Sequence, residues 1–362
     1  GKDPMIKYLG SKRLLIPQIL DRIEALDGVR SVLDLFSGTA RVAQALKRRG
    51  YRVHANDHNS YAATLATCYV QANRRRWQAP TERLIAELNA VPGRTGWFTE
   101  TFCVRARYLQ PVNGARVDAI RERIARLSLE PELEAIALTS LMEAADRVDS
   151  TTGVQMAYLK RWSARSHQPL CLRVPELSAG RGSASCLDAR EAARRFRADV
   201  AYLDPPYNQH SYLGNYHVWE SLVRWDRPAV YGVAMKRADV RERGSPFNRR
   251  GQIEAALGDV IAAVRARHLL VSFSDEGYLT RPQLEALLGG HGAVEVTEVS
   301  YRRYVGARIG IYNPKGEKVG TPGRLTNREW LFLVRGDAAG ALGAPAAHSP
   351  GPKGESTRSA MR

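Results

Sequence analysis

Three short apolar runs, each followed by glycine or polar residues, constrain the fold of this chain most strongly. The runs cover residues 31–36, 51–55 and 200–203. Between the first two lies a helical stretch, 40–49, which ends at Gly50. Strand, helix and strand within so short a span form a βαβ unit, and such a unit places both strands parallel in one sheet. We therefore predict an α/β fold built on a parallel sheet.

The same alternation frames the rest of the chain. One helical pattern, 14–26, precedes the first strand, and another covers 253–264. Further strands are predicted at 268–273, 294–301 and 330–334. After Gly336 the chain is rich in Ala, Gly, Pro and Ser, which cannot bury enough apolar surface to become ordered. We predict that 337–362 is a disordered tail.

The middle of the chain differs from both ends. It is basic, as in Arg74-Arg75-Arg76, and it has helical patterns at 118–127 and 136–146 without any alternation of strands and helices. We interpret it as a mostly helical domain inserted into the sheet domain. The predicted boundaries are 5–70 for the first part of the sheet domain, 71–185 for the insertion and 186–336 for the second part of the sheet domain.

Charge indicates the kind of partner. The formal net charge is +17, which suits a polyanion because Lys and Arg displace counterions from a phosphate backbone. An arginine-rich proteome would give the same balance. The four cysteines show no C-x-x-C spacing, so no metal site is predicted and the thiols are expected to be reduced. No apolar run approaches the roughly 18–20 residues of a membrane span, so we expect a cytoplasmic protein.

Polar residues follow three of the predicted strands. They are Asp34 to Gly38, Asn56-Asp57 and Asp204 to Tyr207. Ligands of open parallel sheets bind at the carboxyl ends of the strands, so these segments can converge on one cleft. Gly38 allows a tight turn against a ligand, and Asp57 can accept hydrogen bonds from both hydroxyls of a ribose. Because G-x-G-x-x-G is absent, no pyrophosphate site is expected, and a nucleoside cofactor without phosphates indicates S-adenosylmethionine. The competing interpretation is an aspartate that caps the next helix.

The strongest signal is Asp204-Pro205-Pro206-Tyr207. An aromatic amine is a poor nucleophile because its lone pair is delocalised into the ring. The Asp204 carboxylate and the Pro205 carbonyl can accept hydrogen bonds from its two hydrogens, and the two prolines fix both acceptors in advance. Tyr207 offers a ring on which a flipped-out base can stack. The sulfonium cofactor is already an activated electrophile, so in-line displacement needs no metal or covalent nucleophile. Pro-Pro is otherwise a common loop breaker.

These residues resemble a known family, the Dam-like, DPPY-type DNA N6-adenine methyltransferases of restriction–modification systems. The resemblance extends from Lys7 to about Val334 and implies a Rossmann-like S-adenosylmethionine-dependent methyltransferase fold. Lys7 to Lys12 looks like the family's first cofactor motif, although Lys12 alone would read as a surface charge. The cofactor-binding residues that the resemblance implies are Tyr8, Gly10, Lys12, Asp34, Phe36, Ser37, Gly38, Asp57, Asp188 and Ala189, and the catalytic residues are Asp204, Pro205, Pro206 and Tyr207.

One position departs from the family. Its loop usually reads F-x-G-x-G, and here Ala40 stands in place of the second glycine. We expect the extra methyl group to crowd the amino-acid end of the cofactor.

The order of the motifs is that of the family's alpha group, which makes the insertion the target recognition domain. We expect it to contact double-stranded DNA, with Tyr216 packing on the flipped base and with Arg105, Arg107, Arg302 and Arg303 as DNA contacts. Further candidates for DNA contacts are Arg94, Arg116, Lys160, Arg161, Tyr301, Tyr304 and Arg308. For each arginine the alternative is a solvated surface charge. We expect the protein itself to associate with the bacterial nucleoid. The sequence leaves open whether a cognate restriction endonuclease belongs to the same system, and it implies no stable complex with one.

Rival activities differ in the residues that they need. N4-cytosine methyltransferases usually have Ser at the position of Asp204, and related RNA base methyltransferases often have Asn there. C5-cytosine methylation uses a cysteine preceded by proline, but Thr67, Phe102, Leu170 and Ser185 precede the four cysteines. A catalytically inactive DNA-binding scaffold is the alternative from another class, and the intact Asp57 and Asp204 argue against it.

Overall fold

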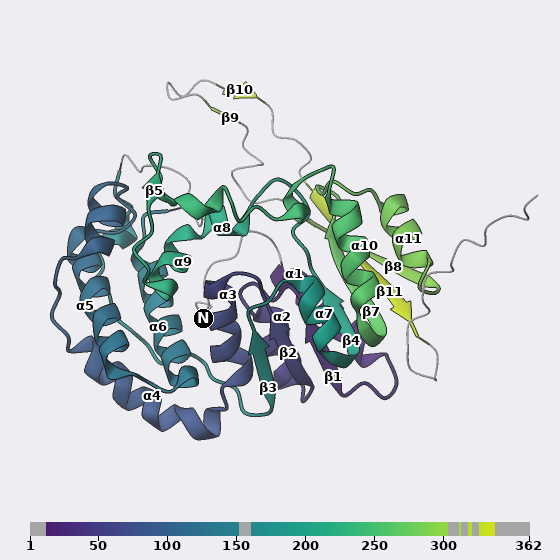
Figure 1. Ribbon diagram of the computed structural model, residues 1–362, viewed down its shortest axis with the longest axis horizontal. Coiled ribbons are helices and arrows are strands. Elements are labelled where there is room, and N and C mark those ends of the chain that lie inside the picture. Colours follow the sequence, from purple (N-terminus) through teal and green to yellow (C-terminus); the bar gives the residue numbers. More distant parts are fainter. Residues whose placement is uncertain (1–11, 152–160, 303–310, 313–317, 321–325, 337–362) are drawn as a thin grey trace, which may run out of the picture.

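A seven-stranded sheet runs through the protein, with helices on both of its faces (Figure 1). The computed structural model describes residues 12–151, 161–302, 311–312, 318–320 and 326–336. In order across the sheet the strands are β3 (Gly182–Ser185), β2 (Arg52–Asn56), β1 (Ser31–Asp34), β4 (Arg197–Leu203), β7 (Arg265–Ser274), β11 (Thr326–Arg335) and β8 (Val294–Arg302). The pairs from β3 to β7 are parallel, whereas β11 pairs antiparallel with both β7 and β8. The predicted parallel sheet is confirmed, with an antiparallel addition at one side.

Successive side chains of the central strands point into two separate cores. Val32 of β1 packs into one apolar cluster, and its neighbour Leu33 packs into the other. The same alternation separates Tyr202 from Leu203 in β4. A strand that is buried on both faces has to be apolar throughout, because its side chains alternate between the faces. This is why these strands appear in the sequence as continuous apolar runs.

The helices divide between the two faces. One core is closed by α7 (Ala189–Arg195), α10 (Ile253–Ala263) and α11 (Arg281–Gly289). The other is closed by α1 (Lys12–Glu24), α2 (Arg41–Arg48), α3 (Ser60–Ala66) and α9 (His217–Arg224), together with the helices of the middle of the chain. The helical patterns at 14–26, 40–49 and 253–264 therefore correspond to observed helices whose ends differ by one or two residues.

The middle of the chain forms a helical layer beside the sheet. It comprises the π-helical turn η1 (Thr67–Gln71), α4 (Arg74–Asn89), the π-helical turn η2 (Thr99–Val104), α5 (Pro111–Leu127), α6 (Pro131–Val148) and the 3₁₀ turn η3 (Ala164–His167). Its buried residues belong to the same apolar core as one face of the sheet. Figure 1 shows α4, α5 and α6 together at one end of the molecule. Within 12–151 and 161–302, none of the helices is long and apolar enough to cross a membrane.

Strand β3 was not expected from the sequence. It lies at 182–185, inside the predicted insertion, so the chain rejoins the sheet earlier than residue 186. Its residues, Gly-Ser-Ala-Ser, are small and only partly buried, so they have no apolar run or alternation that marks a strand. A Cβ atom at Gly182 would collide with the carbonyl oxygen of Val70, so this position has no room for a side chain.

Shorter elements complete the described chain. They are α8 (Tyr212–Asn215), β5 (Val230–Tyr231), β6 (Lys236–Arg237), the 3₁₀ turns η4 (Ala238–Val240) and η5 (Pro246–Asn248), β9 (Ile311–Tyr312) and β10 (Lys318–Gly320). The tail predicted at 337–362 lies outside the described residues.

The β2–β3 edge contains a histidine that we expect to make stability depend on pH. His54 stacks on Phe196 with ring centroids 3.7 Å apart, and its two ring nitrogens contact the hydroxyls of Ser183 (2.6 Å) and Ser185 (2.8 Å). Burial lowers the pKa of His54 to about 4. Between pH 6.5 and 4 the unfolded chain therefore binds a proton that the folded chain does not. Folding should weaken as pH falls through this window, by at most about tenfold in the equilibrium constant per pH unit.

Thermal unfolding of the wild type and of His54→Gln between pH 7 and pH 5 tests this. The wild type should lose more stability than the variant over this range. His210→Gln, which changes an exposed histidine, is the matched control and should behave as the wild type. Equal losses in the wild type and His54→Gln would contradict the assignment.

Candidate functional site

A pocket of about 250 Å³ opens at the carboxyl ends of β1, β2 and β4. Its walls come from segments that are far apart in the sequence. The residues lining it are Leu35, Phe36, Gly38, Asp57, His58, Asn59, Tyr61, Asp188, Ala189, Asp204, Pro206, Ser211, Tyr212, Leu213, Arg243, Gly244, Ser245, Pro246, Phe247 and Asn248. The three polar strand ends that the sequence singled out thus lie around one cavity, which is the place where open parallel sheets bind ligands.

The turn after β1 forms one wall. Gly38 has a positive φ of 53°, which glycine adopts without strain. The N–H of Ser37 donates to the carbonyl of Asn56 at 2.9 Å, which ties this turn to the end of β2. Asp34 and Ser37 are buried and do not line the pocket, so they sit behind this wall.

Ala40 also lies in the left-handed region, with φ of 66°. Its methyl group is fully buried in the apolar core, and the residue does not line the pocket. The side chain therefore points toward the core, and the expectation that its methyl group crowds a bound cofactor stays a prediction.

Asp57 connects two turns of the pocket. Its Oδ2 accepts a hydrogen bond from the N–H of Gly38 and its Oδ1 accepts one from the N–H of Asn59, both at 2.9 Å. Each carboxylate oxygen has a second lone pair, so the group can still accept hydrogen bonds from a diol. Burial raises the pKa of Asp57, the hydrogen bonds from Asn59 and Gly38 lower it, and the charge of Glu220 raises it further. The net effect is a raised pKa.

Asp188 and Ala189 form a further part of the lining, at the start of α7. The Asp188 carboxylate accepts a hydrogen bond from the N–H of Arg190 at 3.1 Å and thereby caps this helix. The side chain is exposed, and it stands beside the aromatic pair of Phe36 and Phe247, whose ring centroids are 5.3 Å apart at 77°. Apolar rings next to a carboxylate acceptor suit the base of a nucleoside.

The tetrapeptide after β4 divides between the pocket and the core behind it. Asp204 and Pro206 line the pocket, whereas Pro205 is buried. Tyr207 does not line the pocket: its ring makes an edge contact with Phe273 at 5.9 Å, and its carbonyl accepts a hydrogen bond from the N–H of Tyr278 at 2.8 Å. The tetrapeptide is therefore fixed from behind, with its acid facing the cavity.

Two residues do not stand where the sequence suggested. Tyr216 is only 3% exposed and lies behind the pocket, packed between Tyr61 and Tyr212, which do line it. The guanidinium of Arg116 donates to the carbonyls of Leu170 and Asn89 inside the helical layer, so it is committed to holding the chain together. Several of these partners are distant in the sequence, so local sequence patterns could not reveal them.

The remaining predicted residues differ in exposure, and the structure describes only some of them. Arg94, Arg105 and Arg161 are exposed, and Arg107 is half-buried with its guanidinium 5.0 Å from the ring centroid of Trp162. The side chains of Lys12, Tyr301 and Arg302 are not described, although their backbones begin α1 and end β8. The other predicted site residues lie outside the described part of the chain: Tyr8, Gly10, Lys160, Arg303, Tyr304 and Arg308.

One whole wall of the pocket was missed from the sequence. It is formed by 243–248, and its buried aromatic residue is Phe247. The local signal is Gly244-Ser245-Pro246, which marks a turn before a helix but carries no indication of a ligand. Tyr61 and Tyr212 were missed for a similar reason, since a tyrosine within a helix more often belongs to the core. Among the described residues, no three His, Cys, Asp or Glu side chains are grouped as metal ligands.

The topology defines the class of protein. Seven strands in this order, with one antiparallel strand next to the edge and helices on both faces, form a Rossmann-like methyltransferase fold. The chain belongs to the D12 class of N6 adenine-specific DNA methyltransferases, because the sequence profile of that family matches residues 8–282.

Individual relatives agree with the family. The chain is 29% identical over 321 residues to "Modification methylase StsI" of Streptococcus sanguinis, covering 83% of this chain and 49% of that protein. It is 29% identical over 322 residues to "Type II methyltransferase M.FokI" of Planomicrobium okeanokoites, covering 83% and 50%. It is 25% identical to "Type II methyltransferase M.NlaIII" of Neisseria lactamica, covering 83% and 92%. The chain thus spans about half the length of the first two relatives.

The position of Asp57 gives a prediction for cofactor binding. Replacing it with Asn should raise the dissociation constant of S-adenosylmethionine by about 10–100-fold, since charge-assisted hydrogen bonds contribute about 1.5–3 kcal/mol. Titration calorimetry measures this. Asp199→Asn is a matched control: its carboxylate also accepts two backbone N–H bonds, from Arg30 and Ser31, at the opposite end of β1.

The raised pKa of Asp57 adds a pH dependence. Protonation removes the charge that accepts hydrogen bonds, so the affinity of the wild type should fall as pH is lowered. This fall should begin at a higher pH than an ordinary aspartate would give. His58 lowers the pKa of Asp57 and Glu220 raises it, through their electrostatic interactions with the carboxylate. An unchanged dissociation constant in Asp57→Asn, or an equal loss in Asp199→Asn, would count against the role of Asp57.

Proposed function

We propose that this chain transfers a methyl group from S-adenosylmethionine to the N6 amine of an adenine flipped out of double-stranded DNA at a specific sequence. The observation that carries the proposal is that Asp204 and Pro206 line the same pocket as Gly38 and Asp57. The acceptor for an amine and the acceptor for a ribose thus face one cavity.

The described lining residues fit the cofactor. Asp57 has lone pairs left for two ribose hydroxyls after it has accepted its two backbone hydrogen bonds. Phe36 and Phe247 offer apolar ring surface for the adenine, and Asp188 can accept from a polar edge. When bound, S-adenosylmethionine supplies a sulfonium-linked methyl group that is already electrophilic.

Asp204 and Pro205 prepare the nucleophile. The carboxylate of Asp204 and the carbonyl of Pro205 accept the two hydrogens of the amine, which directs the nitrogen lone pair out of conjugation with the ring. The prolines and the packing of Tyr207 on Phe273 hold these acceptors in place before the base arrives. Tyr212 and Pro206 line the cavity and offer surfaces against which the flipped base can stack.

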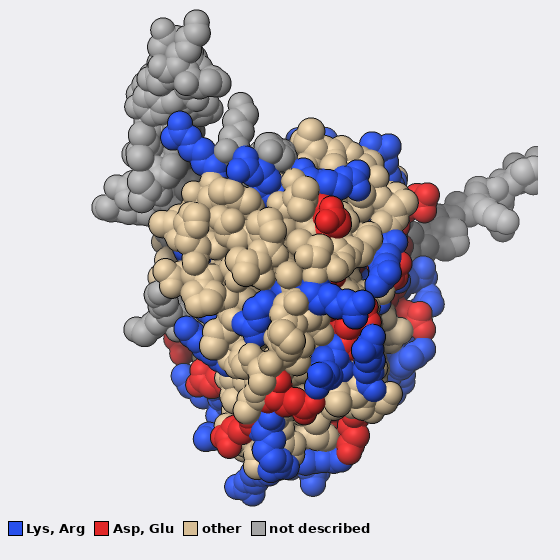
Figure 2. Space-filling model, turned by 90° about the vertical axis from the view of Figure 1, so that its left-hand side faces the viewer, with Lys and Arg blue, Asp and Glu red and all other residues tan. Residues whose placement is uncertain are grey.

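The inserted segment 71–185 is the proposed target recognition domain, and its helices α4, α5 and α6 belong to the helical layer. Figure 2 shows the face of the molecule on the side of α4 and α5, where Lys and Arg side chains spread around an uncharged area, with fewer Asp and Glu. Arg94 and Arg105 are exposed on this layer and can reach phosphate or base edges. The proposal includes action of this protein on nucleoid DNA and a cognate endonuclease in the same restriction–modification system, without a stable complex between the two.

Asp204 provides the direct test of the chemistry. Asp204→Asn should lower kcat by at least about 100-fold, as the loss of one aligned polar group in an active site does, while the dissociation constant of S-adenosylmethionine changes little. Methylation rates with a radiolabelled methyl donor measure kcat. Asp259→Asn, an exposed aspartate on α10, is the control.

The modified base decides between activities. Mass spectrometry of nucleosides from DNA methylated by the wild type should show N6-methyladenine. Finding N4-methylcytosine, or methylated RNA alone, would replace the proposed substrate. Full turnover in Asp204→Asn would refute the role of the carboxylate.

Arg105 tests the recognition domain. Arg105→Ala should weaken DNA binding, and if it contacts a phosphate it should reduce the slope of log affinity against log salt by about 1. Arg281→Ala removes an exposed arginine of α11, on the opposite side of the sheet, and serves as the control. Fluorescence anisotropy over a salt series measures both. Identical slopes for wild type and Arg105→Ala would exclude a phosphate contact by Arg105.

A further inference from the structure

The segment between α9 and α10, residues 225–250, forms a strap across one side of the pocket. Its last part, Arg243 to Asn248, lines the cavity. The strap is anchored in its middle by Arg237, which is 2% exposed. The guanidinium of Arg237 bonds Asp226 at 2.7 and 2.8 Å, Asp239 at 3.0 and 3.2 Å and the hydroxyl of Ser221 at 3.2 Å.

Both partners in this anchor are charged: the guanidinium of Arg237 and the carboxylates of Asp226 and Asp239. Burial alone would lower the pKa of Arg237, but the hydrogen bonds that it donates to Asp226 and Asp239 raise it, so the guanidinium remains protonated. The hydrogen bonds from Arg237 lower the pKa of Asp226. Burial would raise the pKa of Asp239, but the hydrogen bonds and charge of Arg237 bring it below its usual value. Asp239 also pairs with Arg224 of α9 at 3.6 Å. The ion pairs of Arg237 therefore fix the middle of the strap, and they help to position the part that lines the cavity, 243–248.

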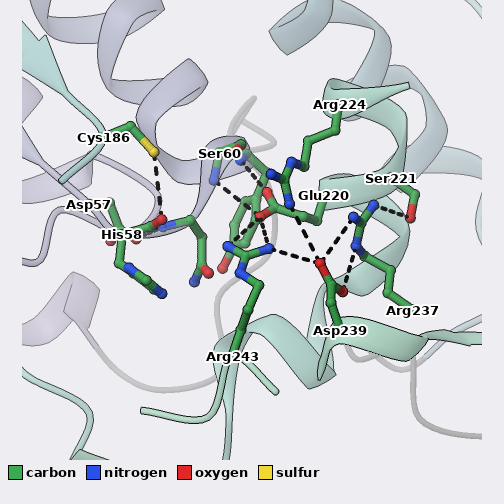
Figure 3. Close-up of polar contacts among 12 residues, drawn as sticks. Asp57, His58, Ser60, Cys186, Glu220, Ser221, Arg224, Arg237, Asp239 and Arg243 are labelled. Carbon is green, nitrogen blue, oxygen red and sulfur yellow. Dashed lines mark hydrogen bonds and ion pairs between the residues drawn. The ribbon is translucent and has the colours of Figure 1, made fainter. Parts of the chain in front are cut away.

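Glu220 of α9 connects the strap to the opposite wall (Figure 3). Its carboxylate is fully buried. It accepts hydrogen bonds from the N–H groups of Tyr61 (2.8 Å) and Ser60 (3.3 Å), which begin α3, and from both terminal nitrogens of Arg243 at 3.2 Å. Arg243 contacts Asp239 as well, at 3.5 Å. One carboxylate thus holds three segments: α9, the strap and the first turn of α3.

The first turn of α3 is continuous with the turn of Asp57. Asp57 fixes one end of that turn by accepting from Gly38 and Asn59, and Glu220 fixes the other end one residue further on. Among the described residues that line the pocket, Arg243 is the single arginine, and no lysine is present. The wall with Asp57 and the wall with Arg243 therefore share Glu220 as their link.

We propose that Glu220 is a positioning residue for the cofactor: through Ser60, Tyr61 and Arg243 it sets the distance between the Asp57 turn and the strap. The inference rests on the proposed function, because it assumes that the cofactor binds between these two walls. A buried ion pair adds little net stability over an apolar pair of the same shape. We therefore expect the Glu220–Arg243 pair to act on the geometry of the pocket and on cofactor binding more than on stability.

Glu220→Gln keeps the shape and one acceptor but removes the charge that holds Arg243. We expect it to raise the KM and the dissociation constant of S-adenosylmethionine at least tenfold, with a much smaller change in kcat at saturating cofactor. Asp204→Asn should do the reverse. Glu285→Gln, which neutralises an exposed glutamate paired with Arg281 on α11, is the matched control and should leave both constants unchanged.

A double-mutant cycle tests the link itself. Arg243→Gln changes the partly exposed partner and should weaken cofactor binding as Glu220→Gln does. If the two residues act as one unit, the double variant should bind no more weakly than the worse single variant. Independent, additive losses would overturn the link. Thermal unfolding of all variants measures how much of each remains folded at the assay temperature. If the loss of affinity is explained entirely by a smaller folded fraction, the inference is overturned.

Different results would contradict the proposed function and the role of Glu220. If the wild type does not bind S-adenosylmethionine in calorimetry, the proposed function is wrong. If the wild type binds and methylates DNA while Glu220→Gln has the same KM and dissociation constant, the proposed function stands and the role of Glu220 is wrong.

Discussion

The parallel pairing of β1 with β2 on one side and β4 on the other is the constraint on which the site depends. It places Asp34 beside Ala55 and Tyr202 in register, so the residues that follow all three strands emerge at one edge. The hydrogen bond from Gly38 to Asp57 then joins two of these exits. The two apolar cores, one on each face of the sheet, keep these turns in place.

Sequence reasoning succeeded where one local feature decides the structure. Apolar runs that end in Gly38, Asp57 and Asp204 predict both the strands and the end of the sheet at which the pocket lies. It failed where the deciding partner is distant. Strand β3 exists because β2 offers an edge to Gly-Ser-Ala-Ser, and the wall from Arg243 to Asn248 is set by ion pairs with Glu220 and Asp239. Neither the pairing of β3 with β2 nor these ion pairs leave a periodic pattern in the local sequence.

Buried charge organises the pocket wall that the sequence did not reveal. Arg237 and Glu220 are 2% and 0% exposed, and each is surrounded by partners of opposite charge or by backbone donors. The six ionised groups of this network are Arg224, Arg237, Arg243, Asp226, Asp239 and Glu220, three of each sign. Removing one member leaves a charge without its partner, which costs more than the pair contributes.

Ala40 shows how the core can compensate for a departure at the edge of a site. A left-handed conformation costs an L-residue about 1–2 kcal/mol, which explains a preference for glycine at this place in the loop. Against that cost, a buried methyl group contributes about 0.8 kcal/mol. Burial therefore offsets part of the cost, because the methyl group of Ala40 lies in the core with Ala43 and Leu46. The loop can therefore keep its shape without the second glycine, and Ala40 does not line the pocket.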